Sequence, residues 1–110
     1  MIETAVLDYL KSVLSVPVYM EKPTDSVKEY VLIEKTGSGK ENYINSATFA
    51  IQSYSTSLYK AAELNEQVKN AMDTIKYSAD VSSAKLNSDY NYTDTTTKSY
   101  RYQAVYDLVF

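Results

Sequence analysis

Segment 37–40 has the sequence Gly-Ser-Gly-Lys, which contains the residue types of a phosphate-binding loop. Such a loop also needs a glycine farther upstream and a serine or threonine directly after the lysine. Those two positions are occupied by Glu34 and Glu41, whose carboxylates would repel a phosphate. The segment therefore predicts a hairpin turn, and no nucleotide site is expected here.

Segment 89–94 carries side-chain oxygens at alternate positions, like the start of a calcium-binding loop. The sixth position of such a loop should be glycine and is Asp94, and the last should be glutamate and is Tyr100. A polar turn explains these residues better. The triplet at 91–93 also fits the glycosylation pattern, which has meaning only for a secreted chain.

Acidic residues recur in a helical segment, at Glu63, Glu66 and Asp73. A catalytic carboxylate pair would require a cleft that raises one of the two pKa values. Lys60 and Lys69 lie within one or two helical turns of these acids, which indicates a solvated face crossed by ion pairs. Asn65, at the edge of the apolar face, leaves two interpretations open: a hydrogen bond to neighbouring backbone or a subunit contact.

The chain contains no Cys and no His. It therefore has no disulfide, no thiolate nucleophile or thiolate metal site, no serine triad of the common type and no HExxH zinc motif. We expect no catalytic, cofactor-binding or metal-binding residues, and the prediction is a protein that is not an enzyme. A small hydrolase using a metal held by Asp and Glu remains the less favoured alternative. It would need Asp73, Asp89 and Asp94 to converge.

Tyrosine is unusually frequent, with 12 among 110 residues and no Trp. Tyr90, Tyr92, Tyr100 and Tyr102 could form a platform on which bases of single-stranded nucleic acid stack. Such platforms need basic residues between the rings, whereas this region supplies only Lys98 and Arg101, and Asp89 and Asp94 oppose them. The net charge of −3 also disfavours binding to phosphates. Packing in the core or in a subunit interface is the favoured interpretation for these tyrosines.

The length of 110 residues predicts a single domain, 1–110, with one core. Apolar residues make up 45% and charged residues 23% of the chain, as in ordinary folded domains. No apolar run is long enough to span a membrane, and no membrane partner is expected. The N-terminus lacks a basic segment followed by an apolar one, so we expect synthesis in the cytoplasm without a signal peptide.

The stretch 47–75 organises the predicted fold. Apolar and polar residues alternate over 47–52, which is typical of a half-buried strand. From Leu58 the apolar spacing changes to three and four residues and continues to Ile75, which predicts an amphipathic helix. Ser55, Thr56 or Ser57 could each cap its first turn.

The other elements follow from the same two periodicities. A first helix is predicted over 2–14, ended by Pro17, and a short strand over 16–20. Further strands are predicted at 30–35, 84–92 and 99–110, with polar connections at 21–29, 36–46, 76–83 and 93–97. Strands 30–35 and 47–54 should form an antiparallel hairpin. The predicted fold is α+β, a two-layer arrangement of a mainly antiparallel sheet with two helices on one face.

Several segments together resemble the small tail-completion proteins of long-tailed phages and prophages of Gram-positive bacteria. This family includes tail terminators and tail-to-head joining proteins. The resemblance extends over nearly the whole chain and consists of a pattern of strands rather than a chemical signature. It rests on the opening helix and on segments 16–20, 30–37, 47–54, 86–92 and 100–106.

The resemblance implies a structural virion protein that forms a ring, typically a hexamer, at the end of the tail tube. Its partners would be further copies of the chain, the tail tube protein and the head–tail connector, and DNA would pass through without specific binding. The location would be the virion at the head–tail junction, after assembly in the host cytoplasm. A head-side adaptor or another minor tail component is the alternative.

The family's loops and strand edges make its subunit and tube contacts. On this chain the corresponding segments are 36–46 and 88–98. Tyrosine and arginine are enriched at the centres of protein interfaces, and Tyr43 and Ile44 are apolar residues within an otherwise polar turn. The candidate contact residues are therefore Tyr43, Ile44, Tyr90, Tyr92, Tyr100, Arg101 and Tyr102.

Overall fold

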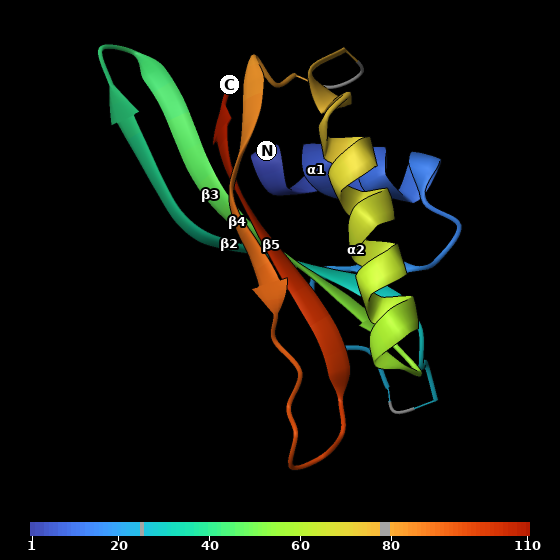
Figure 1. Cartoon of the computed structure of the whole chain (residues 1–110). Coiled ribbons are helices and arrows are strands. Elements are labelled where there is room, and N and C mark those ends of the chain that lie inside the picture. The colour runs from blue at the N-terminus through green and yellow to red at the C-terminus, as the bar shows by residue number, and fades with distance from the viewer. Residues whose placement is uncertain (25, 78–79) are drawn as a thin grey trace.

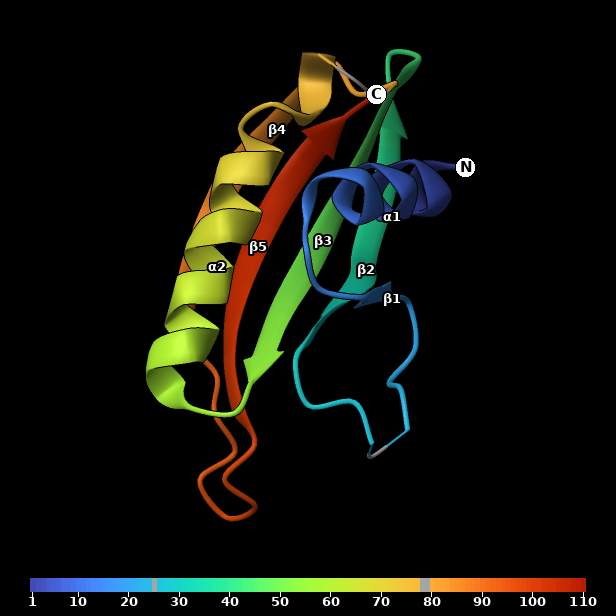
Figure 2. The same ribbon diagram turned by 90° about the vertical axis from the view of Figure 1, so that its right-hand side faces the viewer.

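A computed structural model of the chain describes residues 1–24, 26–77 and 80–110. It contains one five-stranded sheet, in the order β1-β2-β3-β5-β4, and two α-helices that cover the same face of that sheet (Figures 1 and 2). The predicted α+β class is thus confirmed, and the sheet is open. The elements are α1 (Ile2–Val13), β1 (Val18–Tyr19), β2 (Tyr30–Glu41), β3 (Ile44–Ser55), α2 (Leu58–Met72), a 3₁₀ turn (Ile75–Tyr77), β4 (Ser83–Asn91) and β5 (Tyr100–Val109).

The strand pairings are antiparallel except at one edge. β2 pairs with β3, β3 with β5, and β5 with β4, all antiparallel, while the two-residue β1 pairs in parallel with β2. β1 reaches only Val31 and Leu32, so the rest of the outer edge of β2 has no strand beside it in the described part of the chain. β4 forms the opposite edge of the sheet.

Helix α2 begins at Leu58, as the sequence predicts, and it packs on β3 and β5. Ser57 is the residue that caps it, since its hydroxyl accepts a hydrogen bond of 3.2 Å from the Lys60 N–H. Helix α1 crosses β2 and β3 (Figure 2), and a hydrogen bond between the hydroxyls of Tyr9 and Thr74 links it to the segment directly after α2.

The core lies between the helices and the inner face of the sheet. Successive residues of a strand point to opposite faces, so Ile33, Ile51 and Ala104, which lie side by side, face the helices. Around them are the largest fully buried side chains, Tyr106, Phe49, Leu10, Met72, Ile75 and Leu108. In β5 the alternate residues Ala104, Tyr106 and Leu108 are all buried.

One sequence prediction is wrong: segment 36–46 is not a polar turn region. β2 continues to Glu41 and β3 starts at Ile44, so the turn consists of Asn42 and Tyr43 alone. The segment is polar because neither sheet face is covered there, and pairing between the two strands holds it extended. The other predicted elements differ from the observed ones by a few residues at their ends. Parts of the predicted connections 21–29 and 76–83, namely Asp25 and residues 78–79, lie outside the described residues.

Candidate interaction surfaces

The outer end of the β2–β3 hairpin, residues 37–46, is called the arm here, and only its tip, residues 40–45, extends beyond the register of β3 with β5. The pairing of β3 with β5 ends at Ser46 and Val109, whereas the pairing of β3 with β2 continues to Ile44 and Glu41. Figure 1 shows this arm projecting away from the helices. The molecule measures 44 × 25 × 23 Å along its principal axes.

Two predicted contact residues, Tyr43 and Ile44, lie at the tip of the arm. Tyr43 is 92% exposed and Ile44 54% exposed. The turn residues Asn42 and Tyr43 both have positive φ, 51° and 66°, as the tight two-residue hairpin turn requires. Asparagine suits this conformation and a bulky tyrosine rarely adopts it, so the tip holds an exposed aromatic ring at some conformational cost. The Lys40 ammonium lies 5.8 Å from the centre of that ring.

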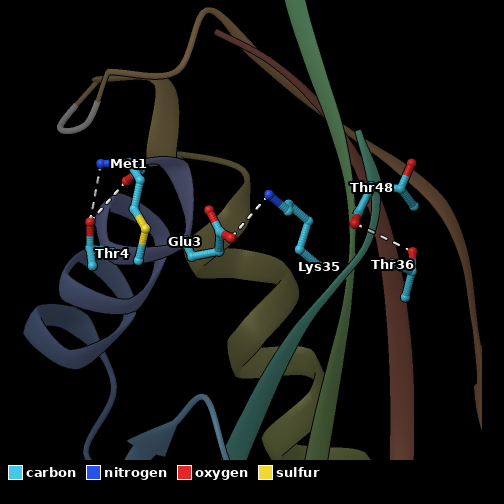
Figure 3. Close-up of polar contacts among 6 residues, drawn as sticks. All are labelled: Met1, Glu3, Thr4, Lys35, Thr36 and Thr48. Carbon is cyan, nitrogen blue, oxygen red and sulfur yellow. Dashed lines mark hydrogen bonds and ion pairs between the residues drawn. The ribbon is translucent and has the colours of Figure 1, made fainter. Parts of the chain in front are cut away.

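The root of the arm is fixed to helix α1 and to its partner strand (Figure 3). The Lys35 ammonium lies 3.0 Å from a carboxylate oxygen of Glu3 in the first turn of α1. The hydrogen bond from Lys35 lowers the pKa of Glu3 below its usual value. Between Lys35 and Gly37 the register shifts by a bulge, and there the Thr36 hydroxyl donates to the Thr48 carbonyl at 3.3 Å. The bulge therefore sets a defined bend in β2 directly before the arm.

Three further predicted residues, Tyr90, Tyr92 and Arg101, form a cluster on the face of the sheet away from the helices. The rings of Tyr90 and Tyr92 meet edge to face, with centres 5.9 Å apart. The Arg101 guanidinium lies 4.5 Å from the centre of the Tyr92 ring, and its Nε donates to the Tyr92 carbonyl at 2.7 Å. Both tyrosines are exposed, so the cluster presents two aromatic rings to the surroundings.

A chain of hydrogen bonds holds this cluster in place across three strands. Arg101 donates to the Tyr54 hydroxyl at 2.7 Å, and that hydroxyl donates to Gln52 at 2.9 Å. Gln52 donates to Gln103 at 2.8 Å, and Gln103 donates to the Tyr90 hydroxyl at 2.6 Å. Tyr54, Gln52 and Gln103 are buried, so the two hydrogen bonds among them are shielded from competing water.

Tyr100 and Tyr102 do not join this cluster, because both alternate with Arg101 along β5. Tyr102 instead lines a shallow hollow of about 410 Å³ beside α2, with Tyr59, Ala62 and Asn65. Tyr100 lines a different cavity at the end of the sheet. The four tyrosines from which a nucleic-acid platform was considered are therefore divided between separate surfaces.

The acidic residues make local interactions. The Lys69 ammonium lies 2.8 Å from Glu66 and 3.4 Å from Asp89, and the hydrogen bond that it donates to Glu66 raises the Lys69 pKa. A hydrogen bond from the Thr97 side chain, together with bonds from the N–H groups of Thr96 and Thr97, lowers the pKa of Asp94. Among residues 1–24, 26–77 and 80–110, no group of three or more His, Cys, Asp or Glu side chains could hold a metal ion.

Asn65 is buried, with 1% of its surface exposed. Its amide lies 3.5 Å from Asp89, which is long for a hydrogen bond, and its Oδ1 has no partner in the described part of the chain. Among the described residues, the Asn65 side chain makes no hydrogen bond to neighbouring backbone, which was one of the two interpretations left open by the sequence. The other, a subunit contact, stays a prediction.

Sequence reasoning missed the supporting residues Gln52, Tyr54 and Gln103. They sit at alternating strand positions that face away from the core, where polar residues are ordinary. Only the register of β3, β4 and β5 brings them into one line. Their clustering could have been anticipated only by assuming that register.

No helix in the described ranges is long and apolar enough to cross a membrane. No protein-family model matches the chain, and no curated protein matches it.

Proposed function

We propose that this chain is a structural assembly protein of a phage tail, which forms a ring that ends the tail tube and joins it to the head connector. The proposal starts from the resemblance of the chain to small tail-completion proteins. The observation that carries it is the projecting arm, residues 37–46, which ends in the exposed Tyr43 and Ile44. An exposed aromatic and a half-exposed aliphatic side chain at the end of a paired hairpin suit insertion into a neighbouring surface.

A ring also requires each copy to use two different surfaces, because its contacts are head to tail. The arm supplies one candidate surface. The cluster of Tyr90, Tyr92 and Arg101 supplies a second, on β4 and β5 rather than on the hairpin of the arm. Tyrosine and arginine are the residue types that carry most binding energy in protein interfaces. The two surfaces support closed association, and the resemblance to tail-completion proteins adds the expectation of a hexamer.

The partners of the proposed ring are the tail tube protein on one side and the head–tail connector on the other. DNA would pass through the channel, and the acidic balance of the chain favours passage without binding. The protein would be assembled in the host cytoplasm and would act in the virion. No enzymatic step belongs to this proposal.

The mass of the purified protein tests the proposal. Light scattering over a concentration series should show a ring of defined stoichiometry, or a monomer that becomes a ring when tail tubes are added. Binding to the tail tube protein supports a terminator, whereas binding only to the head connector supports the alternative of a head-side adaptor. A monomer at every concentration, with no binding to tubes or connector, contradicts the proposal.

A further inference from the structure

A cavity of about 580 Å³ lies at the end of the sheet opposite the arm. One wall comes from the connection before β2, through Lys22 and Lys28, and the other from the turn before β5, through Lys98. Its floor is aromatic, because Tyr30 and Tyr54 stack there with ring centres 4.5 Å apart. Both of these tyrosines are buried, so the floor is part of the folded domain.

The cavity is strongly basic in a protein that is acidic overall. Four cationic residues line it, Lys22, Lys28, Lys98 and Arg101, against a single described carboxylate, Asp94. That carboxylate already accepts hydrogen bonds from backbone N–H groups of its own turn. The chain as a whole carries a net charge of −3. Positive charge is therefore concentrated where three separate segments meet.

The Arg101 guanidinium has hydrogen-bond donors that no described residue uses. Its Nε and one Nη1 hydrogen are used by the Tyr92 carbonyl and the Tyr54 hydroxyl, which fix the plane of the guanidinium. The remaining donors have no hydrogen-bond partner among the described residues, and no described carboxylate lies within 4.0 Å. A fixed arginine with free donors is preorganised to bind a carboxylate or phosphate.

The turn that carries Lys98 is also fixed. Asp94 and Ser99 bond to each other through both backbone groups, which closes the turn. Lys98 then adopts a positive φ of 54°, an uncommon conformation for lysine. This closed turn places its side chain at the wall of the cavity.

We propose that this cavity binds the carboxylates of an acidic segment of a partner protein. The charge of the lining is complementary to Asp and Glu side chains, and the tyrosine floor can pack against the carbon atoms between them. The net negative charge of the whole chain disfavours a long polyanion such as nucleic acid, whereas a short acidic segment needs only the local positive field. This holds whether or not the chain forms a ring.

Amide chemical shifts measured by NMR during titration test the proposal. The probe is a synthetic peptide of alternating Glu and Tyr, compared with a matched peptide of Gln and Tyr, with inorganic phosphate and with oligothymidylate. The acidic peptide should shift the amides of residues 97–101 saturably, and its affinity should fall as salt is added. The Gln peptide should cause no saturable shift.

Two variants locate the site. Lys98→Gly removes a charge and suits the positive φ, so the turn is retained, and Lys22→Gln removes a second charge. Each should weaken binding of the acidic peptide about fivefold, the effect of one unit charge at close range in water. Lys11→Gln on α1 is the matched control and should leave the affinity unchanged, because Lys11 does not line the cavity.

Four results would overturn the proposal. The first is an absence of saturable shifts with the acidic peptide, and the second is an equal response to the Gln peptide. The third is unchanged affinity in both Lys98→Gly and Lys22→Gln. The fourth is tighter binding of oligothymidylate or of phosphate than of the acidic peptide, which would assign the cavity to nucleic acid or to a small anion instead.

Discussion

Replacing Ile44 with aspartate should separate assembly from folding. About half of this side chain is already buried in the single chain, since it is 54% exposed. Full burial of an isoleucine contributes about 1.5–3 kcal/mol, so burying the other half in an interface contributes about 1 kcal/mol. An aspartate there would also have to lose its water, which costs about 2 kcal/mol or more. Each contact should therefore weaken by about 3 kcal/mol, or about a hundredfold.

The free energy of unfolding should change much less. Ile44 lies opposite Glu41 beside the turn, where the new carboxylate meets a like charge across the strands. Such a pair, together with a lower strand propensity, costs about 1 kcal/mol. The melting temperature of the monomer should then fall by about 5 °C.

Val13→Asp is the matched control, because Val13 is another β-branched residue, 50% exposed, and it lies at the end of α1 away from the arm. Light scattering gives the assembly constant of each variant, and thermal melting below the assembly concentration gives its stability. Assembly should be lost in Ile44→Asp and retained in Val13→Asp. Equal losses of assembly and stability in Ile44→Asp, or loss of assembly in both variants, would refute the reasoning.

Three further predictions concern the domain itself. Asn65→Leu should raise the free energy of unfolding by about 1–2 kcal/mol in urea, because it removes a buried Oδ1 that has no described partner; a lower stability would contradict this. The pKa of Glu3 is lower in the folded chain than in the unfolded chain. The ion pair with Lys35 therefore stabilises the fold fully at a pH above the unfolded-state pKa, and this stabilisation is lost as the pH falls through the folded-state pKa. Wild type and Glu3→Gln should therefore converge in acid melts, and a constant difference would count against the ion pair. Burial, with the nearby Asp73 carboxylate, raises the pKa of Tyr106 to about 12. The buried neutral tyrosine therefore stabilises the fold fully below the unfolded-state pKa of about 10, and this stabilisation is lost as the pH rises toward 12. Absorbance titration of wild type against Tyr106→Phe should show this late ionisation, and ionisation near pH 10 would contradict it.

The sequence predicted the helices and the inner sheet face because burial leaves a periodic pattern. Val68, Ala71 and Met72 recur at helical spacing and are buried, as are Ala104 and Tyr106 at strand spacing. In each case one element alone contains the signal. The fold class followed from the order of these elements.

The arm could not be predicted in the same way. Its strands have no covered face, so residues such as Gly37, Ser38 and Gly39 show no alternation and have the composition of a turn. What keeps them extended is the pairing between β2 and β3, which is a property of two segments together.

The basic cavity could not be predicted from the sequence for the same reason. Its cationic residues come from separate parts of the chain: Lys22 from the connection before β2, Lys98 from the turn before β5, and Arg101 from β5 itself. Only the folded sheet brings them together. Of the predicted contact residues, Tyr43 and Ile44 meet at the arm tip and Tyr90, Tyr92 and Arg101 form the second surface. Tyr102 lies on the opposite face because strand residues alternate between faces, and Tyr100 lines the basic cavity together with Arg101.

Electron microscopy of the purified protein, alone and mixed with tail tubes, tests most directly whether it works by self-association and fit to a tube. The account predicts rings with a central channel that cap one end of each tube, and Ile44→Asp should abolish them. Particles of monomer size in both samples, with tube ends left bare, would contradict it.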